Sequence, residues 1–110
     1  MKLPFVLIFR QGTRTLNPEE QKQRTEEVRA WAIRHVGNGT GLDPRVFGQE
    51  SRLLGDTAVR ANGADAVIAV NFLEAESFRD AVQVAESHPG LKYGVSIEVR
   101  PWSDPRARVG

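Results

Sequence analysis

The sequence predicts an α+β fold in which a four-stranded antiparallel sheet carries two helices on one face. Residues 5–9 are apolar on both faces, and so are residues 66–73 except for Asn71, which is typical of buried strands. Residues 95–102 alternate between apolar and polar side chains, as a strand with one buried face does. Helix start signals precede residue 18 and residue 78. With one more short strand between the helices, the predicted order is βαββαβ.

The first helix is predicted over residues 18–36. Asn17 can cap it, Pro18 suits its first position, and Glu20 completes a capping box. Gly37-Asn38-Gly39 then ends it. The inward stripe, read at helical spacing, contains Gln21, Arg24, Val28, Trp31 and His35, with Ala32 and Val36 beside it. Because the first two turns lack apolar side chains, they either project into water or line a polar cavity.

The second helix is predicted to begin after Ser77, with Asp80 in the capping-box position. Its apolar stripe consists of Phe78, Ala81, Val82 and Ala85. Pro89 ends it, because the residue before a proline is pushed out of the helical region. The pattern between the helices is weaker. It predicts a strand within residues 46–54 and a turn at residues 61–65.

Right-handed crossovers turn this order into a ferredoxin-like sandwich. The sheet face without helices would then expose the outer sides of two apolar strands. A patch of that size is normally covered, so we expect a homodimer whose sheets pack face to face, as in dimeric α+β barrels. The expected domain covers residues 1–102, and residues 103–110 are expected to form a flexible tail.

Composition excludes several classes of protein. The net charge of +1 over 110 residues argues against nucleic-acid binding, which usually needs a basic face. With no cysteine and two histidines, neither a metal site nor a cofactor is expected. No glycine-rich phosphate loop is present. The apolar N-terminal run is too short to span a membrane and lacks a signal-peptide cleavage site. We therefore expect a cytoplasmic protein without a membrane partner.

The two histidines are the first candidates for a site. His88 stands at a helix end, where an imidazole could act as a general acid or base. Alternatively, it hydrogen-bonds the last carbonyls of that helix. His35, on the inward stripe of the first helix, either contacts a ligand or is a satisfied core or interface histidine. Arg24, nearer the start of the stripe, could bind a carboxylate or belong to a solvated helix face.

Three charged residues near strand ends are the remaining candidates. Arg10 follows the first strand, and Glu98 and Arg100 share one face of the last strand. If that face lines a cavity, these side chains form a polar floor that could hold an anionic ligand. If it faces outward or toward the dimer seam, they form an ion-pair ladder.

The C-terminal third also carries a family resemblance. The run LEAESFRDAVQVAESHPGL at residues 73–91, followed by VSIEVRPW at residues 95–102, resembles the YCII-related (DGPF-type) domain family. The opening FVLIFR, the LNPEEQ helix start and Trp31 are similar to one branch of it. Gly-Ala-Asp-Ala at residues 63–66 stands in place of the Asp-Gly-Pro-Phe motif. The resemblance implies a dimeric ferredoxin-like barrel, similar to muconolactone isomerase.

For one branch, the resemblance implies action on chlorinated muconolactone-type substrates. We therefore expect a homodimer that binds a small anionic organic molecule between the first helix and the sheet. Isomerisation, lactone chemistry or dehalogenation would use His88 for proton transfer and an arginine to hold a carboxylate. The alternative is a non-catalytic domain that binds a ligand or another protein. An enzyme should bring these groups together in one pocket. Haem or oxygen chemistry rests on fold analogy alone.

Overall fold

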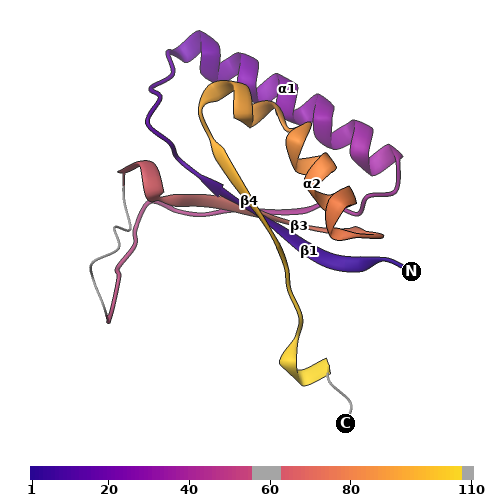
Figure 1. Ribbon diagram of the computed structural model, residues 1–110. Helices are drawn as coiled ribbons and strands as arrows, with labels where there is room; N and C mark the ends of the chain where they lie inside the picture. The colour runs from indigo at the N-terminus through magenta and orange to yellow at the C-terminus, as the bar shows by residue number, and fades with distance from the viewer. Residues whose placement is uncertain (56–62, 108–110) are drawn as a thin grey trace.

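The computed structural model describes residues 1–55 and 63–107 (Figure 1). The main elements are β1 (Leu3–Arg10), α1 (Pro18–Gly37), β2 (Asp43–Val46), β3 (Val67–Ala75), α2 (Phe78–Glu86) and β4 (Ser96–Pro101). All strand pairs are antiparallel, and the sheet order is β2-β3-β1-β4. This is the ferredoxin-like βαββαβ arrangement, so the predicted fold class is confirmed. Three short 3-10 helices also occur: Gly63–Asp65, Pro89–Tyr93 (η2) and Pro105–Ala107.

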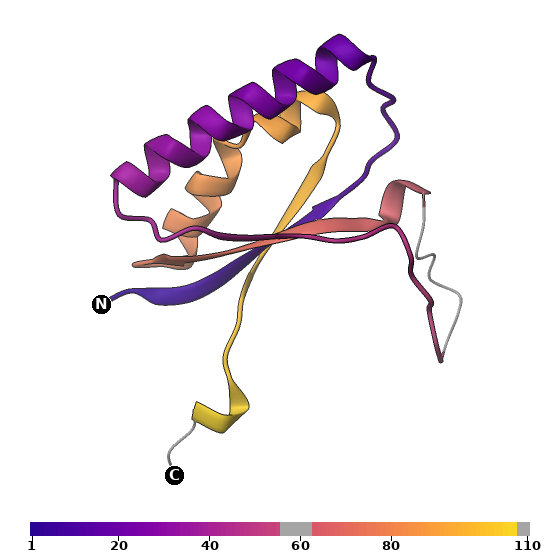
Figure 2. The ribbon, with the colours of Figure 1, turned by 180° about the vertical axis from the view of Figure 1, so that it is seen from behind.

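Both helices lie on one side of the sheet, as the two opposite views show (Figures 1 and 2). α2 packs on β1, β3 and β4, whereas α1 makes its main backbone contacts with η2. The core lies under α2. It is built from Phe5, Leu7 and Phe9 of β1, Leu73 and Ala75 of β3, and Ala81 and Ala85 of α2. The two alanines let α2 approach the sheet closely, because they have no bulk beyond Cβ.

The predicted helix caps are present. Asn17 Oδ1 accepts a hydrogen bond from the Glu20 backbone N–H at 2.8 Å, and Glu20 Oε1 accepts one from the Asn17 N–H at 3.1 Å. At the start of α2, Ser77 Oγ accepts from the Asp80 N–H at 3.1 Å. His88 has extended backbone angles, as expected for a residue before proline. The sequence signals therefore set both helix starts and the end of α2.

The second strand was predicted in the wrong place. It covers Asp43–Val46 and includes Pro44, and residues 47–54 form no strand. Proline is tolerated because β2 is an edge strand that pairs only with β3. The apolar residues that suggested a strand are largely exposed, since β2 ends at Val46 and is followed by one more backbone bond to β3, from the Phe47 N–H to the Ile68 carbonyl at 3.0 Å. Val46 is 85% exposed and Leu54 78% exposed. Of the predicted turn, residues 63–65 form a 3-10 helix, and residues 61–62 lie outside the described residues.

Three predicted inward positions on the helices are also exposed, and one of them is Gln21 of α1. Val36 of α1 is 60% exposed, because this helix stands off the sheet along most of its length. Phe78 of α2 is 50% exposed, and its ring touches only the edge of the core, 6.2 Å from the Phe5 ring. In contrast, Trp31 is 1% exposed and is the buried residue of α1. One aromatic side chain therefore anchors a helix of 20 residues.

Candidate functional site

An open cleft of about 1180 Å³ lies between α1 and the sheet. It exists because α1 rests on η2 and not on the strands. α1 forms one wall with Arg24, Val28 and Trp31, and β3 forms the facing wall with residues 67–71. The cleft thus occupies the position at which the sequence analysis expects a ligand.

The charged residues along this cleft have one sign. Among the described residues that line it, Arg14, Arg24 and Arg45 are charged, and none is acidic. Arg14 pairs with Glu20, and Arg45 pairs with Asp43. Within the part of the chain that the structure describes, Arg24 makes no ion pair. Of the three guanidinium groups, that of Arg24 is therefore the one without a carboxylate partner among the described residues.

Apolar and aromatic side chains form most of the remaining walls. They include Phe9, Leu16, Val28, Trp31, Ile68, Tyr93 and Val95. Tyr93 is oriented by its hydroxyl, which donates to the Glu27 carboxylate. The guanidinium of Arg14 stands 5.8 Å from the centre of the Tyr93 ring. Such walls suit the body of an organic molecule, because pockets for small ligands are mostly apolar with a few polar groups.

His88 lines the cleft and is held rigidly. Its Nδ1 accepts a hydrogen bond from the Gly90 backbone N–H at 2.9 Å. The ring packs between those of Phe9 and Trp31, with centroids 4.8 and 4.6 Å away. The side chain is 9% exposed, and burial lowers the pKa of His88 from 6.5 to about 4 because desolvation disfavours the charged form. His88 is therefore neutral near pH 7.

This geometry also assigns the tautomer of His88. A neutral imidazole has one N–H and one lone pair. Because the Gly90 N–H donates to Nδ1, the proton is on Nε2. The side chain caps the start of η2 through Nδ1, and among the described residues it makes no hydrogen bond to the last carbonyls of α2, the alternative structural role. The catalytic role of His88 stays a prediction.

His35 belongs to a clamp between α1 and the end of α2. Ser87 Oγ donates to the Val84 carbonyl at 2.7 Å and accepts from Trp31 Nε1 at 2.8 Å. His35 Nε2 lies 3.2 Å from the same oxygen, and it must be the donor because the Ser87 hydrogen is already used. Burial lowers the pKa of His35, with a further contribution from Arg34. The geometry matches a satisfied interface histidine, one of the two alternatives.

Arg10, Glu98 and Arg100 lie away from the cleft. Glu98 is the register partner of Ile8, so it points to the sheet face opposite that of Leu7 and Phe9. Arg10 contacts Glu98 at 2.8 Å, and Arg100 contacts it at 3.6 Å. Within one chain these residues form ion pairs on the sheet face without helices, so they do not line this cleft.

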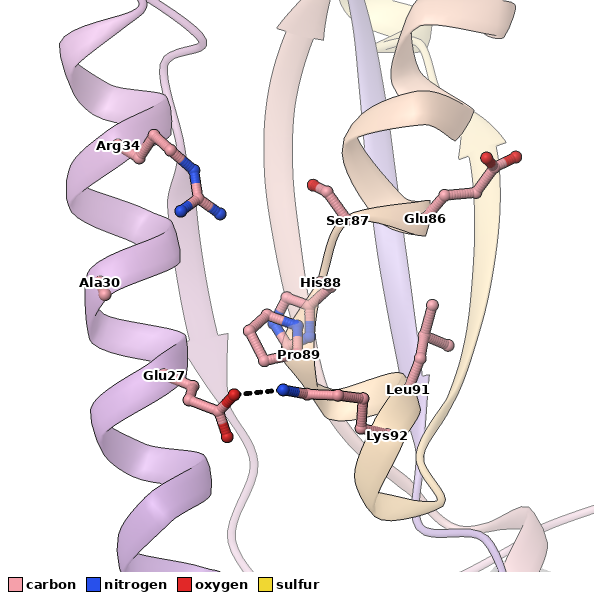
Figure 3. A pocket seen from close by; sticks show the side chains of 9 residues that line it. All are labelled: Glu27, Ala30, Arg34, Glu86, Ser87, His88, Pro89, Leu91 and Lys92. Carbon is pink, nitrogen blue, oxygen red and sulfur yellow. Dashed lines mark hydrogen bonds and ion pairs between the residues drawn. The ribbon is translucent and has the colours of Figure 1, made fainter.

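An outer groove of about 430 Å³ lies between α1 and η2 (Figure 3). Glu27 spans it to pair with Lys92, and this pair lowers the pKa of Glu27, with a smaller effect from Tyr93. Its remaining charged residues are Arg34 and Glu86. Because its central acid and base neutralise each other, this groove offers less to a charged ligand than the inner cleft.

Asn71 is a site residue that the sequence analysis passed over. It is 6% exposed, lies in β3 and lines the cleft. Its Oδ1 accepts from the Asp43 backbone N–H at 3.1 Å, which helps to hold β2. The only signal was an amide interrupting an apolar strand. Arg14 and Tyr93 were also missed, because Arg14 reaches the cleft from a loop and Tyr93 from the end of η2, and the sequence does not reveal the path of either segment.

Models of known protein families give no match to this chain, and neither do curated protein sequences. Among the described residues, no group of three or more metal-ligating side chains is placed to hold an ion. None of the helices in residues 1–55 and 63–107 has the length and hydropathy needed to cross a bilayer.

Proposed function

We propose that this protein binds a small organic anion in the cleft between α1 and the sheet. The observation that carries the proposal is the charge of the lining, where the described residues include three arginines and no acid. Arg24 has no ion-pair partner among them, and a planar guanidinium suits a carboxylate. The aromatic walls suit the organic part of the ligand.

A homodimer is part of the proposal. On the sheet face without helices, the register places Val6 beside Phe72 and Ile8 beside Val70. Trp102 stands over Phe72 with ring centroids 5.7 Å apart and is still 43% exposed. The radius of gyration is 15.4 Å, whereas a compact chain of this length has about 13 Å. A second copy packed on this face would cover the apolar centre.

Catalytic turnover is the second candidate. The observation that favours it is the presence of His88 in the cleft wall, where isomerisation, lactone chemistry or dehalogenation would need a proton-transfer group. However, Nδ1 of His88 is occupied, and no described lining residue is acidic. We therefore favour binding without turnover. A YCII-related origin and a cytoplasmic location remain hypotheses from the sequence.

A thermal-shift screen with small mono- and dicarboxylates and lactones tests the binding proposal. A ligand at about a hundred times its dissociation constant adds about 2.7 kcal/mol to the free energy of unfolding. Arg24→Gln should lose most of this gain. Arg29→Gln is the matched control, since Arg29 is exposed on the same helix and does not line the cleft. No stabilisation of the wild type, or equal loss in both variants, would contradict the proposal.

A further inference from the structure

We propose that the cleft recognises an uncharged acceptor oxygen of its ligand through a neutral hydrogen-bond donor, Nε2–H of His88, with the Nδ2 amide of Asn71 as a second donor further along β3. This inference rests on the proposed function and narrows its ligand class. The ligand is an organic anion that carries a carbonyl oxygen, as a ketone, ester or amide, in addition to its carboxylate.

The two residues share one arrangement. His88 and Asn71 are the buried polar residues among those described, and both line the cleft. In each, the acceptor atom already accepts a hydrogen bond from a backbone N–H. Nδ1 of His88 accepts from Gly90 at 2.9 Å, and Oδ1 of Asn71 accepts from Asp43 at 3.1 Å. Their donor nitrogens make no hydrogen bond within the described part of the chain. No fully buried side-chain nitrogen or oxygen there lacks a partner, so both donors retain accessible surface.

The imidazole of His88 cannot turn to present a different atom. Phe9 and Trp31 hold its two sides. A Cβ built on Gly90 would lie 2.9 Å from Nδ1, so the backbone closes over that edge of the ring. Turning the ring would also leave the Gly90 N–H unpaired, which costs about 1–3 kcal/mol for a buried group. The structure therefore preorganises Nε2–H as a donor, and such fixed donors polarise carbonyl oxygens.

A hydrogen bond from the backbone also fixes the orientation of the Asn71 amide. Its oxygen is assigned by the N–H that donates to it, which leaves the NH₂ group as a donor. Asn71 pairs with Leu7, and Ala69 pairs with Phe9, which contacts His88. Asn71 is thus two residues from Ala69 along β3, which corresponds to about 7 Å between their Cα positions along the strand. Together with Arg24 on the opposite wall, the polar groups at these positions are donors, so a ligand must supply acceptors.

The first part of the test needs no ligand. Nitrogen-15 NMR of the imidazoles reports which ring nitrogen carries the proton. At about pH 7, we expect His88 to be neutral with the proton on Nε2, since its other nitrogen accepts a hydrogen bond. A proton on Nδ1, or a charged ring, would overturn the inference.

The second part compares three probes by titration calorimetry: 4-oxocyclohexanecarboxylate, cyclohexanecarboxylate and trans-4-aminocyclohexanecarboxylate. The first two differ only in the carbonyl oxygen, and the third carries an ammonium donor instead. We expect the oxo acid to bind at least about tenfold more tightly than the plain acid, and the amino acid to bind weakest. Equal affinities would overturn the inference and leave the proposed function intact. If the wild type binds none of the probes, the proposed function fails, and the inference fails with it.

His88→Asn and His88→Gln form a matched pair of variants. An Asn oxygen can still accept from the Gly90 N–H, but its amide does not reach the position of Nε2. A Gln amide can reach that position. We expect the ratio of the two affinities, oxo acid over cyclohexanecarboxylate, to fall close to one in His88→Asn and to stay partly raised in His88→Gln. An unchanged preference in His88→Asn would contradict the role of His88.

Discussion

Acidification should destabilise this protein through His88. The pKa of His88 falls from 6.5 to about 4 on folding because the ring is buried. Between these values the unfolded chain binds more protons than the folded one, so the free energy of unfolding decreases as the pH falls. Since the two pKa values differ by about 2.5, the full loss is about 3 kcal/mol, reached below about pH 4.

Most of this loss occurs before the carboxylates titrate. Between about pH 7 and about pH 5, the linkage relation assigns about 2 kcal/mol to His88. A domain of ordinary stability has about 5–15 kcal/mol in total, so the change is easily measured. Glu20, Glu27 and Asp104 also have lowered pKa values. Their contributions are lost only as the pH falls below the ordinary values of 4.5 and 3.8.

Urea unfolding followed by far-UV circular dichroism at several pH values measures the effect. His88→Gln removes the titrating group and should remove most of the pH dependence in this window. His35→Gln is the control. Burial also lowers the pKa of His35, but that side chain is less buried than His88, so most of the slope should remain. Equal slopes for the wild type and His88→Gln would refute the assignment, as would an ordinary pKa for His88 in NMR.

Three further predictions concern packing and assembly. Ser87→Ala leaves the donors of Trp31 and His35 without their shared acceptor. The free energy of unfolding should therefore fall by about 1–3 kcal/mol in urea titrations. No change would mean that water replaces the hydroxyl fully. Gly90→Ala places a methyl group 2.9 Å from the held imidazole and should cost about 1–3 kcal/mol. By contrast, Gly37→Ala meets no atom within 4 Å and should stabilise by about 0.5–1 kcal/mol; similar effects of the two alanines would contradict the packing argument. Ile8→Glu puts a carboxylate in the sheet face without helices and should convert the proposed dimer into a folded monomer in light scattering. A wild type that is already monomeric at micromolar concentration rules out the proposed dimer.

Local signals predicted the elements that are stabilised by nearby residues. The capping box at Asn17 and the cap at Ser77 act within three residues of the chain, so the sequence alone located both helix starts. The alternation after Val95 likewise predicted the last strand. The strand after the first helix was misplaced because β2 is held from outside, by the Asn71 side chain and by pairing with β3. No pattern within residues 43–46 reveals that contact.

The candidate site shows the same division. Composition and periodicity determined that this chain forms an α+β domain. They also placed His88 after the second helix and showed that the inward stripe of the first helix begins with polar residues. The tertiary structure decided what these residues do, since α1 stands off the sheet to open a cleft. It brought Arg24, Asn71 and His88 to that cleft and paired Arg10 with Glu98 elsewhere. The physical reason is distance along the chain. A cap forms between residues three apart, whereas the protonation state of His88 depends on burial beside Phe9 and Trp31, which only the folded chain brings to it.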